Sequence, residues 1–194
     1  MGRFYIDKKY FARKQSGNWV SFETSPELKR TKSDIYGKCV PCMTNLYEQL
    51  KEGKTKIELG PAHQCWKVVV PLRGMEECIQ FLSEFERDFL EDLDVKGRFG
   101  STSDPARDTK VIVCGAESET KQDRLFVRLK ACASYINLET QVFYHRGCAE
   151  LYHELFFGDW RKWNETESVK NQAMVGVVLE KIRKALFWVN GGRP

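Results

Sequence analysis

The chain has 194 residues, of which 42% are hydrophobic and 30% are charged, and it carries a formal net charge of +4. This composition is typical of a folded soluble protein and excludes a disordered chain, a collagen-like repeat and a small disulfide-stapled fold. No run of about 18 apolar residues could form a membrane helix, and the N-terminus lacks the apolar core of a secretion signal. The seven cysteines lack the spacing of a disulfide framework, so we expect reduced thiols and a cytoplasmic protein.

The predicted elements begin with a hairpin over residues 3–23, whose two alternating strands flank a glycine-containing turn at 15–18. A short helix over 41–52 follows a polar, basic loop, and its Pro41 suits the first helical position. Residues 56–59 are predicted to be extended. The first 60 residues carry 12 basic and 7 acidic side chains, so this part either attracts phosphates weakly or is a solvated face.

The middle of the chain predicts a regular alternation of strands and helices. The order is strand, helix, strand, strand, helix, strand, over residues 66–72, 75–93, 94–101, 110–114, 118–136 and 140–144. Apolar residues spaced three and four apart indicate the two helices. Such an order is typical of an antiparallel sheet with helices packed on one face, and the N-terminal hairpin would extend that sheet. We therefore predict an α+β fold.

We expect a single domain over residues 1–194. Residues 1–60 would hold the basic hairpin and short helix, and residues 61–146 the strand-helix core. Residues 147–194 would hold the C-terminal helices, which the apolar spacing predicts over 148–157 and 166–189.

Five cations on or near the predicted strands are candidates for a phosphate site. Lys96 and Arg98 are one residue apart, so they project from the same face of a strand, and the glycine between them would let a ligand approach the backbone. Lys67 belongs to another strand, and Arg107 and Lys110 flank a turn. These side chains could hold a phosphate through charge-assisted hydrogen bonds. The alternative is a plain solvated sheet face.

Four of the five tryptophans are candidate stacking platforms. Trp19, Trp160 and Trp163 lie beside turns or charges, where their rings could stack on bases or on a cationic ring. Trp66 opens a predicted buried strand and is either a platform or core. Aromatic side chains that cap a core are the alternative for all four.

A third group of residues has the chemistry of a zinc site. Cys39, Cys42, His63 and Cys65 supply four soft ligands, the number that tetrahedral zinc requires. The alternatives are scattered structural cysteines or a redox thiol pair. Zinc would be the cofactor if this group binds metal, and otherwise no cofactor is expected.

A further set of segments carries a resemblance over residues 19–163. The segments are Gly17-Asn18-Trp19, Cys65–Val70, Lys96–Arg98, Lys110–Cys114, Asp123-Arg124, Val142–His145 and Gly158-Asp159-Trp160. Their order and aromatic residues resemble the basophilic-leukaemia-expressed protein family, whose fold is similar to that of the messenger-RNA cap-binding translation initiation factor. The resemblance implies a curved antiparallel sheet backed on one face by helices, with a ligand surface on its concave side. In cap binders two tryptophans sandwich the base, so the resemblance suggests Trp19 as one platform and Lys96 and Arg98 as phosphate ligands.

The same family is similar to bacterial phosphothreonine lyases, which remove phosphate by β-elimination with a lysine base and a histidine acid. Lys67 and Lys96 could correspond to the lysines of that site, but Val69 occupies the place of the strand histidine.

The sequence thus predicts a binding module, rather than an enzyme, for a phosphorylated ligand such as a nucleotide or an RNA end. One alternative is a phosphothreonine-lyase-like enzyme that acts on phosphopeptides or phosphoproteins. The other is a protein-interaction scaffold without a small ligand.

Overall fold

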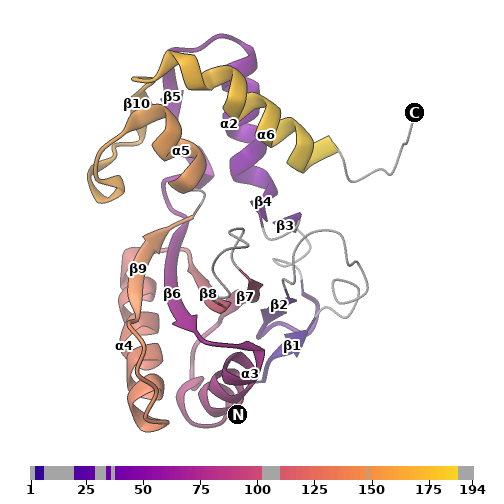
Figure 1. Ribbon diagram of the computed structural model, residues 1–194, viewed down its shortest axis with the longest axis vertical. Helices are drawn as coiled ribbons and strands as arrows, with labels where there is room; N and C mark the ends of the chain where they lie inside the picture. Colours follow the sequence, from indigo (N-terminus) through magenta and orange to yellow (C-terminus); the bar gives the residue numbers. More distant parts are fainter. Residues whose placement is uncertain are drawn as a thin grey trace. The chain divides into compact units, whose positions relative to one another are not determined.

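The computed structural model describes residues 3–6, 20–28, 34–35, 38–101, 110–147 and 149–187 (Figure 1). The chain divides into two compact units, which are described separately. Unit 1 comprises residues Met1–Lys32 and Trp66–His145, and unit 2 comprises Ser33–Cys65 and Arg146–Pro194. The chain passes between the units after Lys32, Cys65 and His145, and the segments expected over 1–60, 61–146 and 147–194 stay predictions. The single domain over 1–194 stays a prediction.

Unit 1 is built on a six-stranded sheet with the order β1-β2-β7-β8-β6-β9 (Figure 1). The strands are β1 (Tyr5–Ile6), β2 (Val20–Glu23), β6 (Trp66–Leu72), β7 (Lys96–Ser101), β8 (Lys110–Ala116) and β9 (Phe143–Arg146). The pairs β1–β2, β2–β7, β7–β8 and β6–β8 are antiparallel. The N-terminal strands therefore extend the sheet as predicted, and helix together with antiparallel sheet confirms the α+β class.

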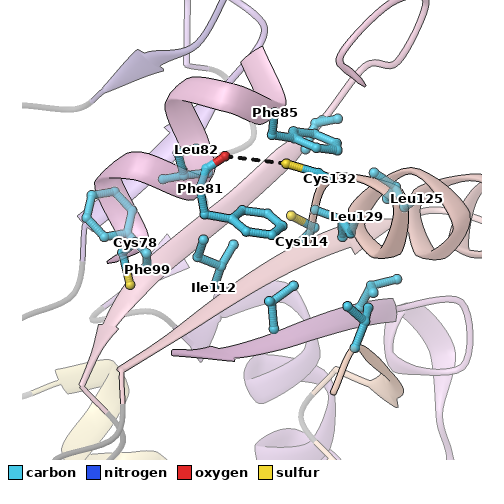
Figure 2. Close-up of a cluster of buried hydrophobic side chains, with 14 of the residues drawn as sticks. Cys78, Phe81, Leu82, Phe85, Phe99, Ile112, Cys114, Leu125, Leu129 and Cys132 are labelled. Carbon is cyan, nitrogen blue, oxygen red and sulfur yellow. Dashed lines mark hydrogen bonds between the residues drawn. The ribbon is translucent and has the colours of Figure 1, made fainter. Parts of the chain in front are cut away.

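Two helices, α3 (Met75–Glu84) and α4 (Glu119–Tyr135), pack with the sheet around one hydrophobic core. Figure 2 shows Phe81 and Phe85 lying near Leu129 of α4 and Ile112 of β8. Side chains alternate along a strand, so the residues of the sheet that enter this core define its helix-facing side. They are Val20 and Phe22 of β2, Phe99 of β7, Ile112, Cys114 and Ala116 of β8, and Val68, Val70 and Leu72 of β6.

The helix predicted over 75–93 is shorter in the structure. It ends at Glu84 and passes into a π-helical segment, η3 (Phe85–Phe89). The wider turn of a π-helix changes the side-chain spacing, and Asp92 then adopts a left-handed conformation with φ 55° that ends the helical path. Ile79 of α3 is exposed, whereas Phe81 lies in the core.

Unit 2 has its own hydrophobic core, in which Leu46, Tyr152, Phe156 and Ile182 are fully or almost fully buried. Its helices are α2 (Val40–Lys51), α5 (Ala149–Phe156) and α6 (Val175–Phe187), with the short segments η2 (Gly60–Ala62), η4 (Trp160–Lys162) and η5 (Gln172–Met174). Its strands are β3 (Asp34–Ile35), β4 (Lys38–Cys39), β5 (Lys56–Glu58) and β10 (Thr166–Ser168). Along the described residues, no helix is long and apolar enough to span a bilayer.

The predicted helix over 166–189 is wrong in its first part. Residues Thr166–Ser168 form β10, which pairs antiparallel with β5, and the Leu59 N–H donates to the Glu165 carbonyl at 2.7 Å. Backbone N–H and carbonyl groups that form hydrogen bonds in a sheet cannot also form the hydrogen bonds of a helix. The helix therefore begins only at Val175, after the non-helical Asn171.

Gly97 permits a close contact at the centre of unit 1. A Cβ at this position would lie 2.4 Å from Cζ of Phe22 and 2.8 Å from the backbone oxygen of Val113. Phe22 is fully buried, so its ring occupies the space that a side chain at residue 97 would need. The glycine between Lys96 and Arg98 thus serves core packing on the helix-facing side, and not the approach of a ligand as its sequence context suggested.

Gly97→Ala is expected to lower the free energy of unfolding by about 1–3 kcal/mol, because the added methyl group overpacks the core. Urea denaturation followed by circular dichroism measures the change. Gly176→Ala is the matched control, since a Cβ there has nothing within 4 Å and alanine favours a helix. Equal stability of Gly97→Ala and the wild type would contradict the packing argument.

Three cysteines belong to the core of unit 1. Burial raises the pKa of the Cys78 thiol to about 11, and that of Cys114 and of Cys132 to about 12. The Cys132 thiol also donates to the Phe81 carbonyl, with sulfur and oxygen 3.8 Å apart (Figure 2). Because the thiolate is the reactive form, these side chains are structural.

Cys78, Cys114 and Cys132 are expected to resist a thiol reagent at about pH 8 in the folded protein, whereas the half-buried Cys65 reacts faster than these three. Peptide mapping by mass spectrometry distinguishes the sites. Their raised pKa values also add stability that is complete below about pH 9, the ordinary thiol value, and is lost as the pH rises toward 12. Labelling of Cys114 as fast as that of Cys65 would contradict this assignment.

Candidate functional site

The side of the sheet opposite α3 and α4 carries three of the predicted phosphate ligands. Strand alternation places Lys67 of β6 on this side, together with Lys96 and Arg98 of β7. All three side chains are half-buried. We call the side defined by Lys67, Lys96 and Arg98 the cation face.

The strand register aligns two of these cations in one row across the sheet. Lys96 is the cross-strand partner of Gly115 on β8, and Gly115 is in turn the partner of Lys67. A Cβ at Gly115 would lie 3.2 Å from Nζ of Lys67, so the ammonium group lies over the glycine backbone, between β6 and β7. The absence of a side chain at Gly115 therefore makes room for Lys67, and this role was not recognised from the sequence.

A buried carboxylate ends the same row. Glu23 of β2 is the direct cross-strand partner of Lys96 and is 0% exposed. Directly paired residues have Cβ atoms about 5 Å apart, which is within reach of charge attraction. A buried carboxylate needs such a cation to offset its lost hydration. With Arg98 in the next row, the described residues of β2, β6, β7 and β8 place three cations and one carboxylate on this face.

Lys110 lies on the other side of the sheet. Along β8, Lys110 is an even number of residues from Ile112 and Cys114, which enter the core, so its side chain points to the same side as theirs. Its positive charge also lowers the pKa of the Cys78 thiol in α3, against the larger effect of burial. Lys110 is also five residues along β8 from Gly115, which is about 17 Å. Lys110 therefore does not join Lys67 and Lys96. Arg107, the fifth predicted ligand, lies outside the described residues.

Among the described residues, Trp66 is the predicted tryptophan platform that belongs to unit 1. Trp66 is half-buried and packs against the core on the helix-facing side, and Trp19 lies outside the described residues.

In unit 2, Trp163 is 7% exposed and lies in the core against Tyr152 and Phe156, so its faces are not available to a base. Trp160 is half-buried, with the guanidinium carbons of Arg161 and Arg146 at 5.5 Å and 6.0 Å from the ring centre. Trp163 is therefore a core residue, and Trp160 already has cationic neighbours.

The predicted zinc ligands do not form a cluster among the side chains that the structure describes. No three His, Cys, Asp or Glu side chains in that part of the chain gather as metal ligands. Cys42 is buried in the core of unit 2, whereas His63 lines an open pocket with Glu58 and Glu165. The side chain of Cys39 lies outside the described part.

A buried amide of α4 fixes the strand that carries Lys67. Nε2 of Gln122 donates to the Lys67 carbonyl at 2.5 Å and to the His145 carbonyl at 3.0 Å. Gln122 is 3% exposed, so it bridges β6 and β9 from inside the unit. The backbone at Lys67 is thereby held from the side opposite its ammonium group.

The edge strand β9 presents an aromatic side chain to the same face as the cations. Val142 is buried in the core, and Tyr144 stacks on Phe126 of α4 with ring centres 4.2 Å apart. Alternation then directs Phe143 to the cation face, where it is 40% exposed. The strand that carries Phe143 is predicted from the sequence, but the exposure of its ring on this face follows only from the structure.

Comparison of the chain with protein-family models, curated proteins and solved structures finds no match. The resemblance to the basophilic-leukaemia-expressed family and the curvature of the sheet stay predictions.

Gln122→Leu is expected to lower the free energy of unfolding by about 1–3 kcal/mol, because two carbonyls lose their shared donor. Urea denaturation measures the loss, and amide hydrogen exchange should rise in β9 before it rises in β8. Gln64→Leu, at an exposed position, serves as the control. Unchanged exchange in β9 would show that the bridge does not hold the edge strand.

Proposed function

We propose that unit 1 binds a phosphorylated ligand, a nucleotide or an RNA end, on the cation face. The observation that carries the proposal is the position of the Lys67 ammonium over Gly115, in the same row as Lys96. Two cations in one row can donate to different oxygens of one phosphate, and Arg98 in the next row can donate to a further oxygen.

Two features of the face favour a phosphate over a simple counterion site. Glu23 lies at one end of the row as the cross-strand partner of Lys96, and the Lys67 ammonium lies over the Gly115 backbone. The exposed ring of Phe143 on β9 supplies an apolar surface on which a base can stack. A ligand with both a phosphate and a flat ring matches these two surfaces.

Lys67→Ala and Lys96→Ala are each expected to weaken binding of a guanosine nucleotide about tenfold, because each removes a charge-assisted hydrogen bond. Isothermal titration calorimetry measures the affinity. Lys130→Ala, which removes a charge from an exposed position of α4, is the matched control. Gly115→Ala keeps every charge but crowds the Lys67 ammonium, so it should also weaken binding.

The same titration separates the proposal from its alternatives. Preference for a methylated over an unmethylated base would support cap-like recognition, and equal affinity would indicate a general phosphate site. Unchanged affinity in both lysine variants would overturn the proposal. A lyase would instead convert a phosphopeptide to a dehydrated product, visible by mass spectrometry, and a scaffold would give neither binding nor product.

A further inference from the structure

His145 lies on the strand next to the one that carries Lys67. The Lys67 and His145 carbonyls accept hydrogen bonds from the same atom, Nε2 of Gln122, at 2.5 Å and 3.0 Å. The two residues must therefore be neighbours across β6 and β9, which are adjacent strands of the sheet (Figure 1). This extends the row to Lys96, Gly115, Lys67 and His145.

The direction of the His145 side chain follows from its neighbours on β9. Val142 enters the core and Tyr144 stacks on Phe126 of α4, so both point to the helix-facing side. Alternation along the strand turns His145 to the cation face, as it does Phe143. His145 is half-buried, like Lys67.

We propose that His145 is a further ligand of the phosphate site, and that its protonated form adds a positive charge to the row formed by Lys96, Gly115 and Lys67. This inference rests on the proposed function, because it concerns the same anion. An imidazolium donates a charge-assisted hydrogen bond to an anion, whereas the neutral ring carries no charge for it. Anion binding should therefore strengthen when His145 is protonated.

The charged groups around His145 couple its protonation to the binding of an anion. Lys67 on β6 is the cation beside it on the same face, and Lys96 lies beyond Gly115. On the helix-facing side, Asp123 of α4 is engaged by the Tyr144 hydroxyl, and Arg146, the next residue, lies against Trp160. A neighbouring ammonium disfavours a second positive charge, and a bound dianion removes that penalty. Anion and proton must then favour each other's binding to the same degree.

Sulfate is the appropriate probe, because it stays a dianion across the range in which histidine titrates. Calorimetric titration of the whole protein is expected to show binding about tenfold tighter at about pH 5.5 than at about pH 8. His145→Gln, which keeps a neutral polar side chain, should bind sulfate with little dependence on pH. The chain has three histidines, so His63→Gln and His153→Gln are matched controls that should keep the wild-type dependence.

Two results would separate this inference from the proposed function. If the wild type binds sulfate equally at both pH values, or if His145→Gln keeps the full dependence, His145 is not a ligand and the lysine site stands. If the wild type binds no sulfate at either pH, the proposed function itself is wrong.

A second measurement needs no variant in the site. Nuclear magnetic resonance resolves the titrations of the three imidazoles, and the controls assign their signals. Added sulfate should move the His145 titration to higher pH and leave those of His63 and His153 in place. An unmoved His145 titration in protein that binds sulfate would overturn the inference.

Discussion

A single buried amide joins the strand that carries Lys67 to the edge strand that carries Phe143 and His145. Gln122 projects from α4, and its Nε2 atom joins the backbones of β6 and β9. Because both acceptors are main-chain carbonyls, the bridge sets the position of the two strands and not merely of two side chains. Strand alternation then sends Val68 and Val142 into the core and leaves Lys67 on the opposite side.

Much of unit 1 could be predicted from local patterns. The strand over 66–72 is apolar except for Lys67 and ends before Arg73, and the structure confirms its bounds. The helix over 118–136 is confirmed to within a residue at each end, because Ser118 is its N-cap, and its Leu125 and Leu129 are buried. The bounds of these elements are set by residues close by in the sequence, so the sequence of one chain is enough to predict them.

The parts that were missed depend on partners far along the chain. Whether Lys110 shares a face with Lys67 depends on strand register, and the space that Gly97 leaves is filled by Phe22 from another strand. Residue type was also a poor guide to chemistry in unit 2. Trp163 and Cys42 have reactive or stacking side chains, but they are also large or soft apolar groups, and the structure uses them as core.

The interleaving of the two units has a consequence for biosynthesis. β2 pairs with β1 but gains its second partner only when β7 has been made, since Val20 pairs with Phe99, and α2 must wait for α6, with which it packs. A growing chain on the ribosome thus exposes the apolar residues of β2 and α2 long before their partners emerge. Such non-local pairing slows folding and leaves nascent hydrophobic surface that chaperones shield. Unit 1 can therefore fold only after the chain has been made through His145, and unit 2 only after α6 has followed.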